Sequence, residues 1–269
     1  MPNQTSSEIV KLDFSNNDLV ERAYDGEVYE DDGWRLKPLL HKYLRDLNDR
    51  ASTRKQGVYS PSAMAKCRRA AYYNRTKVPQ RALLPPEKRL LFDLGHAVQW
   101  QYNNYLEEML ALGYFGDDTV LLNHNLYLGA PAIIGGEADF LLLQKEGSTP
   151  KRVIDFKTIS TTGFEALRTP TITPDGRVLP DTMRTYVWQV MSYQAMFGAP
   201  NGTLYYVNKN NSLEKELSFP FSYAVWERFS ERVSQTEENI AVGTVPDFEV
   251  NQYCRECAFF YHCQPPGVK

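Results

Sequence analysis

The sequence predicts a mixed fold of helices and strands, either α/β or α+β. Two observations lead to this class. Apolar residues recur at helical spacing in the N-terminal part, and the period changes to that of strands from about residue 119. A helical pattern then returns after the third strand pattern, so one helix is expected to cross between strands of the same sheet.

Three helices are expected before the sheet. Apolar spacing predicts one over 35–51 and a long one over 86–112, which stops near Gly113. Between them, Ser60 can cap a helix whose first position is Pro61. The buried stripe of the long helix is expected to consist of Leu90, Leu91, Leu94, Val98, Tyr105 and Met109.

The sheet is expected to contain five strands, three before and two after a crossing helix at 182–198. Their ranges are 119–128, 131–144, 152–159, 203–209 and 213–220. The segment 169–181 is punctuated by Pro and Gly, so it is expected to be a loop. A last helix is predicted over 222–241.

Composition excludes several classes of protein. With 42% hydrophobic and 23% charged residues, the chain of 269 residues has the balance of an ordinary soluble globular protein. No stretch reaches the ~18 apolar residues of a membrane span, and the N-terminus lacks the basic and apolar regions of a secretory signal. We therefore expect a cytoplasmic protein without a membrane partner. The net charge of -3 does not indicate a strongly basic nucleic-acid-binding domain.

One local cluster, 67–77, nevertheless interleaves cations with aromatic residues. Arg68, Arg69, Tyr72 and Tyr73 could contact a phosphate backbone and stack on bases, so they are the predicted DNA-binding residues. The alternative interpretation is an amphipathic helix with a solvated basic face.

The stretch VIDFKT, 153–158, carries an acid and a base inside an apolar strand pattern. Alternate residues of a strand share a face, so Asp155 and Lys157 lie on one face, and Ile154 and Phe156 on the other. A simple ion pair would explain the two charges. A metal site would explain them together with Asp139, which begins the preceding apolar strand, because two carboxylates suit Mg²⁺ or Mn²⁺. Lys157 could then orient a water and stabilise charge on a phosphate.

The four cysteines form a second candidate metal site. Cys67 stands alone, whereas Cys254, Cys257 and Cys263 follow a C-x-x-C-x₅-C pattern near the C-terminus. In a cytosolic chain such a set is better explained by a metal than by disulfides. Spacing does not separate tetrahedral Zn²⁺ from a [4Fe–4S] cluster. His262 lies beside Cys263 and is interpreted as a bystander.

Asp139 followed by Asp155-Phe156-Lys157 resembles the signature of the PD-(D/E)XK nuclease superfamily. The resemblance implies a restriction-endonuclease-like core, with a central mixed sheet flanked by helices. It also implies Mg²⁺ or Mn²⁺ held by the two aspartates and the Phe156 backbone carbonyl, with Lys157 as a catalytic residue.

Two further features resemble the RecB-like branch of this superfamily. In DLGHAVQ, His96 follows a glycine and occupies the position of that branch's additional metal ligand. In WQVMSYQ, Gln189 and Tyr193 match its Q-x-x-x-Y motif, lie on one helix face and are counted with the catalytic residues.

The cysteines also resemble those of AddB-type nucleases and CRISPR adaptation exonucleases, in which one cysteine precedes the nuclease core and three follow it. This resemblance implies a [4Fe–4S] cluster that joins the C-terminal tail to the N-terminal helices. We accordingly divide the chain into an N-terminal arm and helix, 1–57, and a RecB-like nuclease domain, 58–269, with the Cys₄ cluster.

The expected function is metal-dependent hydrolysis of DNA by an exonuclease that acts on single-stranded ends. A 5′ to 3′ direction is implied by the resemblance alone. The alternatives are a non-catalytic DNA-end-binding or assembly module, and an endonuclease whose cysteines hold structural zinc. Because no Walker A motif occurs, any helicase would be a separate partner, as would recombination or replication proteins.

Overall fold

The computed structural model describes residues 36–50, 57–80, 85–128, 134–144, 149–251, 253–264 and 267. The chain divides into two units, Met1–Leu40 and His41–Lys269. Of the first unit, only the beginning of helix α2 (Leu36–Arg50) is described. The expected N-terminal arm lies outside the described residues, and the following paragraphs concern the second unit.

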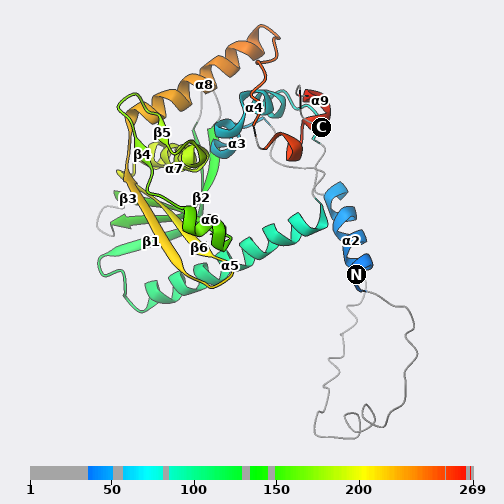
Figure 1. Cartoon of the computed structure of the whole chain (residues 1–269). Helices are drawn as coiled ribbons and strands as arrows, with labels where there is room; N and C mark the ends of the chain where they lie inside the picture. The colour runs from blue at the N-terminus through cyan, green and yellow to red at the C-terminus, as the bar shows by residue number, and fades with distance from the viewer. Residues whose placement is uncertain are drawn as a thin grey trace, which may run out of the picture. The chain divides into compact units, whose positions relative to one another are not determined.

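A five-stranded mixed sheet forms the centre of the second unit, in the order β1-β2-β3-β6-β7 (Figure 1). The strands are β1 (Asp118–Leu128), β2 (Ile134–Gln144), β3 (Thr149–Ile159), β6 (Asn201–Asn208) and β7 (Glu214–Pro220). Neighbouring strands are antiparallel except β3 and β6, which are parallel. A parallel pair needs a crossover connection, and α7 (Arg184–Phe197) supplies it, as predicted.

Helices cover both faces of the sheet (Figure 1). On one face, α7 contacts β3 and β6, and α8 (Tyr223–Ala241) packs on α7. Two short helices, α3 (Pro61–Lys66) and α4 (Arg68–Arg75), pack on α7 and α8 respectively. On the other face, the long helix α5 (Pro86–Ala111) contacts β1 and β3. The mixed α/β class predicted from the sequence is therefore confirmed.

The alternation in β3 separates two hydrophobic clusters. Val153 faces the main core, which contains the buried residues of α7 and α8. Phe156 faces the other side and packs with Phe140 and Val207 against α5. The predicted alternation of faces in VIDFKT is therefore confirmed, and one face holds Asp155 and Lys157 next to α7.

The helix start at Ser60 is also confirmed. Its side chain accepts a hydrogen bond from the Ala63 N–H at 3.2 Å, and Pro61 occupies the first helical position. Tyr59 precedes the cap, forms a bridge to β2 at Ile134 and donates a hydrogen bond to Glu237 of α8 at 2.7 Å. These contacts attach α3 to the sheet and to α8.

The predicted buried stripe of the long helix is wrong for five of its six residues. Leu90, Leu91, Leu94, Tyr105 and Met109 are exposed, and only Val98 is partly buried. The helix instead contacts the sheet through Val98, Tyr102 and Leu106, which are four residues apart. Periodicity identifies an apolar stripe, but tertiary packing decides which stripe meets the sheet.

Several short elements were not predicted from the sequence pattern. The expected loop 169–181 contains the two-residue strands β4 (Thr171–Ile172) and β5 (Val178–Leu179) and the start of a 3₁₀ turn, η2 (Asp181–Met183). An additional helix, α6 (Thr161–Ala166), follows β3. Such segments are too short to show a period. None of the helices in the described ranges is long and apolar enough to span a membrane.

A glycine allows β2 and α7 to approach closely. A Cβ atom at Gly136 would lie 2.5 Å from Cε1 of Tyr193, within the van der Waals contact distance. We predict that Gly136→Ala lowers the free energy of unfolding by about 1–3 kcal/mol, because the ring is packed in the core. Urea denaturation would measure this change. The matched control is Gly95→Ala, whose Cβ would approach only the Thr158 hydroxyl at 3.1 Å, and an equal loss in both variants would contradict the prediction.

Candidate active site

Asp139 and Asp155 meet where β2 and β3 separate. The register pairs of these strands end at Phe140 and Ile154, which are the chain neighbours of Asp139 and Asp155 respectively. The Asp139 carboxylate takes the place of the missing strand partner, because its Oδ2 accepts the Phe156 N–H at 2.7 Å. Its Oδ1 accepts a hydrogen bond from Gln99 of α5 at 2.9 Å. Both oxygens of Asp139 are therefore held in fixed directions.

Asp155 is only 1% exposed and lies between β3 and α7. Gln189 Nε2 donates to its Oδ1 at 3.1 Å and lies 3.4 Å from the Tyr193 hydroxyl. Lys157 Nζ lies 2.5 Å from Asp155 Oδ2. No donor among the described residues is aligned to hydrogen-bond to that oxygen. The structure thus brings together five of the predicted residues: Asp139, Asp155, Lys157, Gln189 and Tyr193.

Burial dominates the electrostatics of this cluster. It raises the pKa of Asp155 to about 6, although Lys157 opposes the shift. Burial also raises the pKa of Asp139, against the effects of Lys157 and of the two hydrogen-bond donors. For Lys157, burial would lower the pKa, but Asp155 and then Asp139 outweigh it, so that its pKa is raised and the ammonium persists at neutral pH.

The donor set suits a divalent cation. Carboxylate oxygens are hard ligands of the kind that Mg²⁺ and Mn²⁺ prefer. Two carboxylates face one ammonium, and Asp155 Oδ2 is a buried oxygen that lacks an aligned hydrogen bond. Within the described part of the chain, however, no three His, Cys, Asp or Glu side chains converge on one metal position. The pair can therefore provide part of a coordination shell, to be completed by backbone, water or phosphate oxygens.

The other predicted metal ligands stay predictions. His96 is exposed on α5, one turn before Gln99. Phe156 contributes its N–H to Asp139, while the role expected for its carbonyl oxygen is untested. Gln99 and the Phe156 N–H are site groups that sequence reasoning missed. The one available signal for Gln99 was its position a single helical turn after His96.

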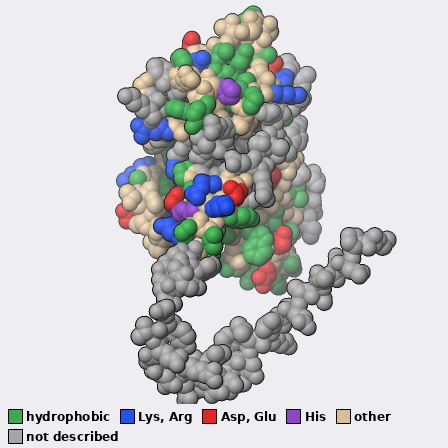
Figure 2. Space-filling model, turned by 90° about the vertical axis from the view of Figure 1, so that its right-hand side faces the viewer, with side chains coloured by type: hydrophobic (Ala, Val, Ile, Leu, Met, Phe, Trp, Pro, Cys, Tyr) green, Lys and Arg blue, Asp and Glu red, His purple; other side chains and the backbone are tan. Residues whose placement is uncertain are grey.

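The predicted DNA-binding residues lie in α4 and make protein contacts. Arg68 Nη1 donates to Gln235 at 2.5 Å, and the Arg69 guanidinium lies 3.8 Å from the centre of the Phe248 ring. Tyr72 and Tyr73 are largely buried, and Tyr73 packs against Phe259. Basic and acidic side chains are interspersed on the face shown in Figure 2. A role of these four residues in DNA binding stays a prediction.

The four cysteines are free thiols in one region of the fold. Cys67 separates α3 from α4, while the other three lie in η3 (Cys254–Glu256), directly after it, and in α9 (Phe260–Cys263). Burial raises the pKa of Cys67, Cys257 and Cys263, and the Cys257 thiol raises that of Cys67 further. The thiols are therefore electrostatic neighbours, although the described residues hold no converged metal site.

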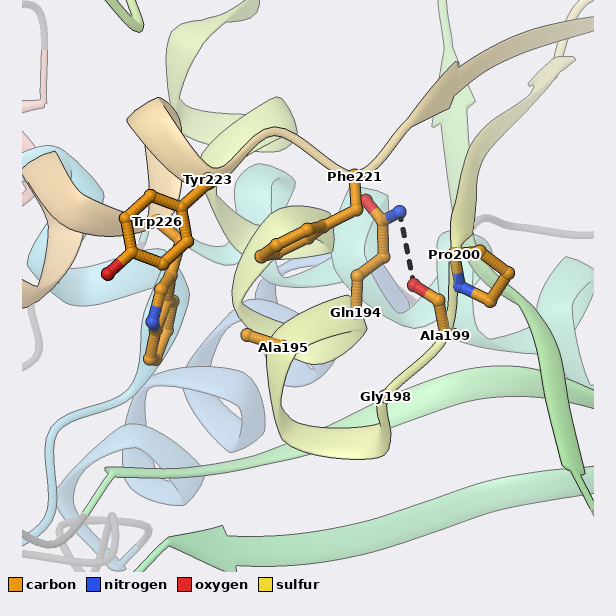
Figure 3. Close-up of a pocket in the computed structure, with 8 residues that line it drawn as sticks. All are labelled: Gln194, Ala195, Gly198, Ala199, Pro200, Phe221, Tyr223 and Trp226. Atoms are coloured by element: carbon orange, nitrogen blue, oxygen red, sulfur yellow. Dashed lines mark hydrogen bonds between the residues drawn. The ribbon is translucent and has the colours of Figure 1, made fainter.

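An apolar pocket of about 320 Å³ lies where α7 ends, next to the beginnings of β6 and α8 (Figure 3). Phe221 and Trp226 contribute aromatic rings to it, and Gln194 contributes an amide. None of the predicted site residues lines this pocket.

Comparison with known proteins gives likenesses of fold only. No family model and no curated protein matches the chain. The crystal structure of SSO0001 is 18% identical, with 88% of this chain and 99% of that chain covered and a TM-score of 0.47. An alkaline exonuclease from Laribacter hongkongensis is 13% identical and has a TM-score of 0.45, with 74% of this chain and 93% of the exonuclease covered. A phage related exonuclease from Haemophilus somnus 129PT is 13% identical and has a TM-score of 0.38, with 73% of this chain and 98% of that exonuclease covered. Likenesses this distant assign no activity or substrate to this chain.

The raised pKa of Asp155 predicts a pH dependence of stability in the metal-free protein. Between its ordinary pKa of 3.8 and about 6, the folded state retains a proton that the unfolded state has released. The free energy of unfolding should therefore fall by up to about 3 kcal/mol as the pH rises from 3.8 through about 6, because the stabilisation by this proton is lost.

Urea denaturation of wild type and Asp155→Asn with a chelator, from pH 4 to pH 7, would measure this loss. The wild type should become less stable relative to the variant as the pH rises. Asp117→Asn, at an exposed turn, should show a constant difference from wild type. If the free energy of unfolding of Asp155→Asn differed from that of wild type by the same amount at every pH, the raised pKa of Asp155 would be contradicted.

Proposed function

We propose that this chain is a metal-dependent DNA nuclease. The observation that carries the proposal is the assembly of Asp139, Asp155 and Lys157 where β2 and β3 separate. Two buried carboxylates that share one ammonium are costly to a fold, so a cation that binds between them offers a physical reason for the second acid. An ion pair alone would account for Asp155 and Lys157 but not for Asp139.

Mg²⁺ or Mn²⁺ would be held by Asp139 and Asp155, with His96 and the Phe156 carbonyl as further proposed ligands. When bound, such a cation lowers the pKa of a water and polarises the phosphodiester. Asp139 is oriented for this role by Gln99 and the Phe156 N–H.

The other side chains orient and stabilise charge. Gln189 directs Asp155 Oδ1, and Tyr193 lies beside the Gln189 amide. Lys157 presents an ammonium that can hold the attacking water and offset negative charge on the phosphate as the bond breaks. DNA is the proposed substrate, and action from single-stranded ends in the 5′ to 3′ direction is the narrower proposal.

The cysteines are proposed to hold a [4Fe–4S] cluster, with Zn²⁺ as the alternative. Four thiols are soft donors that suit either group. The C-terminal segment that carries three of them is already attached to α3 and α4, since Asn251 Nδ2 donates to the Lys66 carbonyl at 3.0 Å and Glu249 accepts the Arg68 N–H at 3.1 Å. A bound group would strengthen this attachment and have a structural role.

Lys157→Ala should reduce cleavage of labelled single-stranded DNA with Mn²⁺ by about 100-fold or more, because charge at the phosphate would no longer be offset. The rate of cleavage and the melting temperature would both be measured. Lys151→Ala is the matched control, since it removes another β3 lysine that pairs with an aspartate, Asp118, away from the site.

Substrates blocked at the 5′ end, blocked at the 3′ end or circular would separate the narrower proposals. Cleavage of circular DNA would show that the enzyme is an endonuclease and not an exonuclease. A wild type that binds DNA ends without cutting any substrate in Mg²⁺ or Mn²⁺ would favour a binding module instead.

Protein purified without oxygen should be brown and contain about four iron and four sulfide per chain if the cysteines hold the cluster. Cys257→Ser should lose the colour and the iron, because thiolate ligands are required. Cys67→Ser should have the same effect, because it removes a thiolate of the same site from the other end of the chain. A colourless protein that contains one zinc per chain would show that the cysteines hold Zn²⁺ and not the cluster.

A further inference from the structure

Two tyrosines beside Lys157, and a third that lies next to them, are not used by the proposed cleavage reaction. Lys157 Nζ lies 5.9 Å from the centre of the Tyr186 ring. Tyr206 is the register partner of Lys157 on β6, and its ring meets that of Tyr186 edge-on at 6.5 Å. Tyr253 lies next to Tyr186 from the C-terminal segment. The Tyr186 ring therefore adjoins the ammonium, and the other two tyrosines lie next to Tyr186.

Tyr186 belongs to the face of α7 that serves the site. It precedes Gln189 by three residues and Tyr193 by seven, so the three side chains form one stripe. Burial raises the pKa of the Tyr186 hydroxyl, and the neighbouring Tyr253 hydroxyl, close enough to share a hydrogen bond, raises it further. The ring thus contacts Lys157 on one side while its hydroxyl meets the C-terminal segment.

Tyr253 is held in place by the segment that carries the cysteines. It directly precedes Cys254, and its N–H donates to Asn251 Oδ1 at 2.9 Å. Asn251 donates in turn to the carbonyl of Lys66, the residue before Cys67. The Lys66 ammonium lies 4.9 Å from the centre of the Tyr253 ring. Both parts of the cysteine region therefore converge on Tyr253.

We propose that Tyr186 is a positioning residue that keeps the Lys157 ammonium at Asp155, and that Tyr253 fixes Tyr186 to the cysteine-bearing segment. An ammonium on a four-carbon stem has several rotamers, and the Asp155 contact alone does not select one. An aromatic face within about 6 Å attracts a cation and narrows that choice. The order of the cysteine segment is transmitted to Lys157 through the two tyrosines. This inference rests on the proposed function only for its effect on cleavage.

Chemical labelling of lysines, measured by mass spectrometry of the Lys157 peptide, tests the proposal without DNA or added metal. Tyr186→Leu removes the ring and should increase the labelling rate of Lys157 about fivefold. Lys151, whose side chain is 43% exposed, is the internal reference. Tyr205→Leu is the matched control, because it removes a half-buried tyrosine that stacks on Phe156 on the opposite face. It should leave Lys157 labelling unchanged.

The link to the C-terminal segment is tested by deleting hydroxyl groups. Tyr186→Phe and Tyr253→Phe keep both rings and should each increase Lys157 labelling about twofold. The double variant should match either single variant, because both changes act on the same contact between the two hydroxyl groups. Additive effects would overturn the link. Labelling of Lys157 at the wild-type rate in Tyr186→Leu would overturn the positioning role.

Cleavage kinetics separate this inference from the proposed function. If the wild type cleaves DNA, Tyr186→Leu should lower kcat with KM unchanged, and Tyr186→Phe should restore most of the activity. If the wild type cleaves no DNA, the proposed function fails, while the labelling result still decides whether Tyr186 positions Lys157.

Discussion

The contact between Asp155 and Lys157 on β3 is the constraint on which the site depends. A carboxylate that is 1% exposed is cut off from water, and burial is the largest cause of its raised pKa, which stands at about 6 after the opposing effect of Lys157. The nearby ammonium offsets this cost, but a second acid, Asp139, adds negative charge to the same space. The regular pairing of β2 and β3 ends there, and hydrogen bonds from Gln99, the Phe156 N–H and Gln189 stabilise the two carboxylates.

The two faces of the sheet contribute different parts of the site. The α7 face supplies Gln189 and Tyr193 to Asp155, whereas α5 reaches Asp139 from the other face through Gln99. The separated strands let helices on opposite faces hold the two carboxylates. These two helices are far apart along the chain, since the long helix precedes the three antiparallel strands and α7 follows them.

The N- and C-terminal segments of the second unit form a common layer beside α7 and α8. Salt bridges from Arg68 and Arg232 meet at Glu249, and Arg75 pairs with Glu237 of α8. Direct contacts already join this layer, so a metal or cluster at the cysteines would add to an existing attachment. Through Tyr253, the same layer reaches α7.

The sequence by itself determined the features that depend on neighbours along the chain. Strand alternation placed Asp155 and Lys157 on one face, and helical spacing put Gln189 and Tyr193 together. Ser60 began a helix because its side chain accepts the N–H of Ala63, three residues on. These are local rules with periods of two or about four residues.

Only the tertiary structure decided which distant groups complete the site. Gln99 is brought to Asp139 across 40 residues of sequence, and Tyr253 to Tyr186 from the other end of the fold. Tertiary packing also left most of the predicted apolar stripe of α5 exposed, so that the helix meets the sheet through Val98, Tyr102 and Leu106 instead. Such contacts follow from how helices pack across a sheet, and no local period encodes that choice.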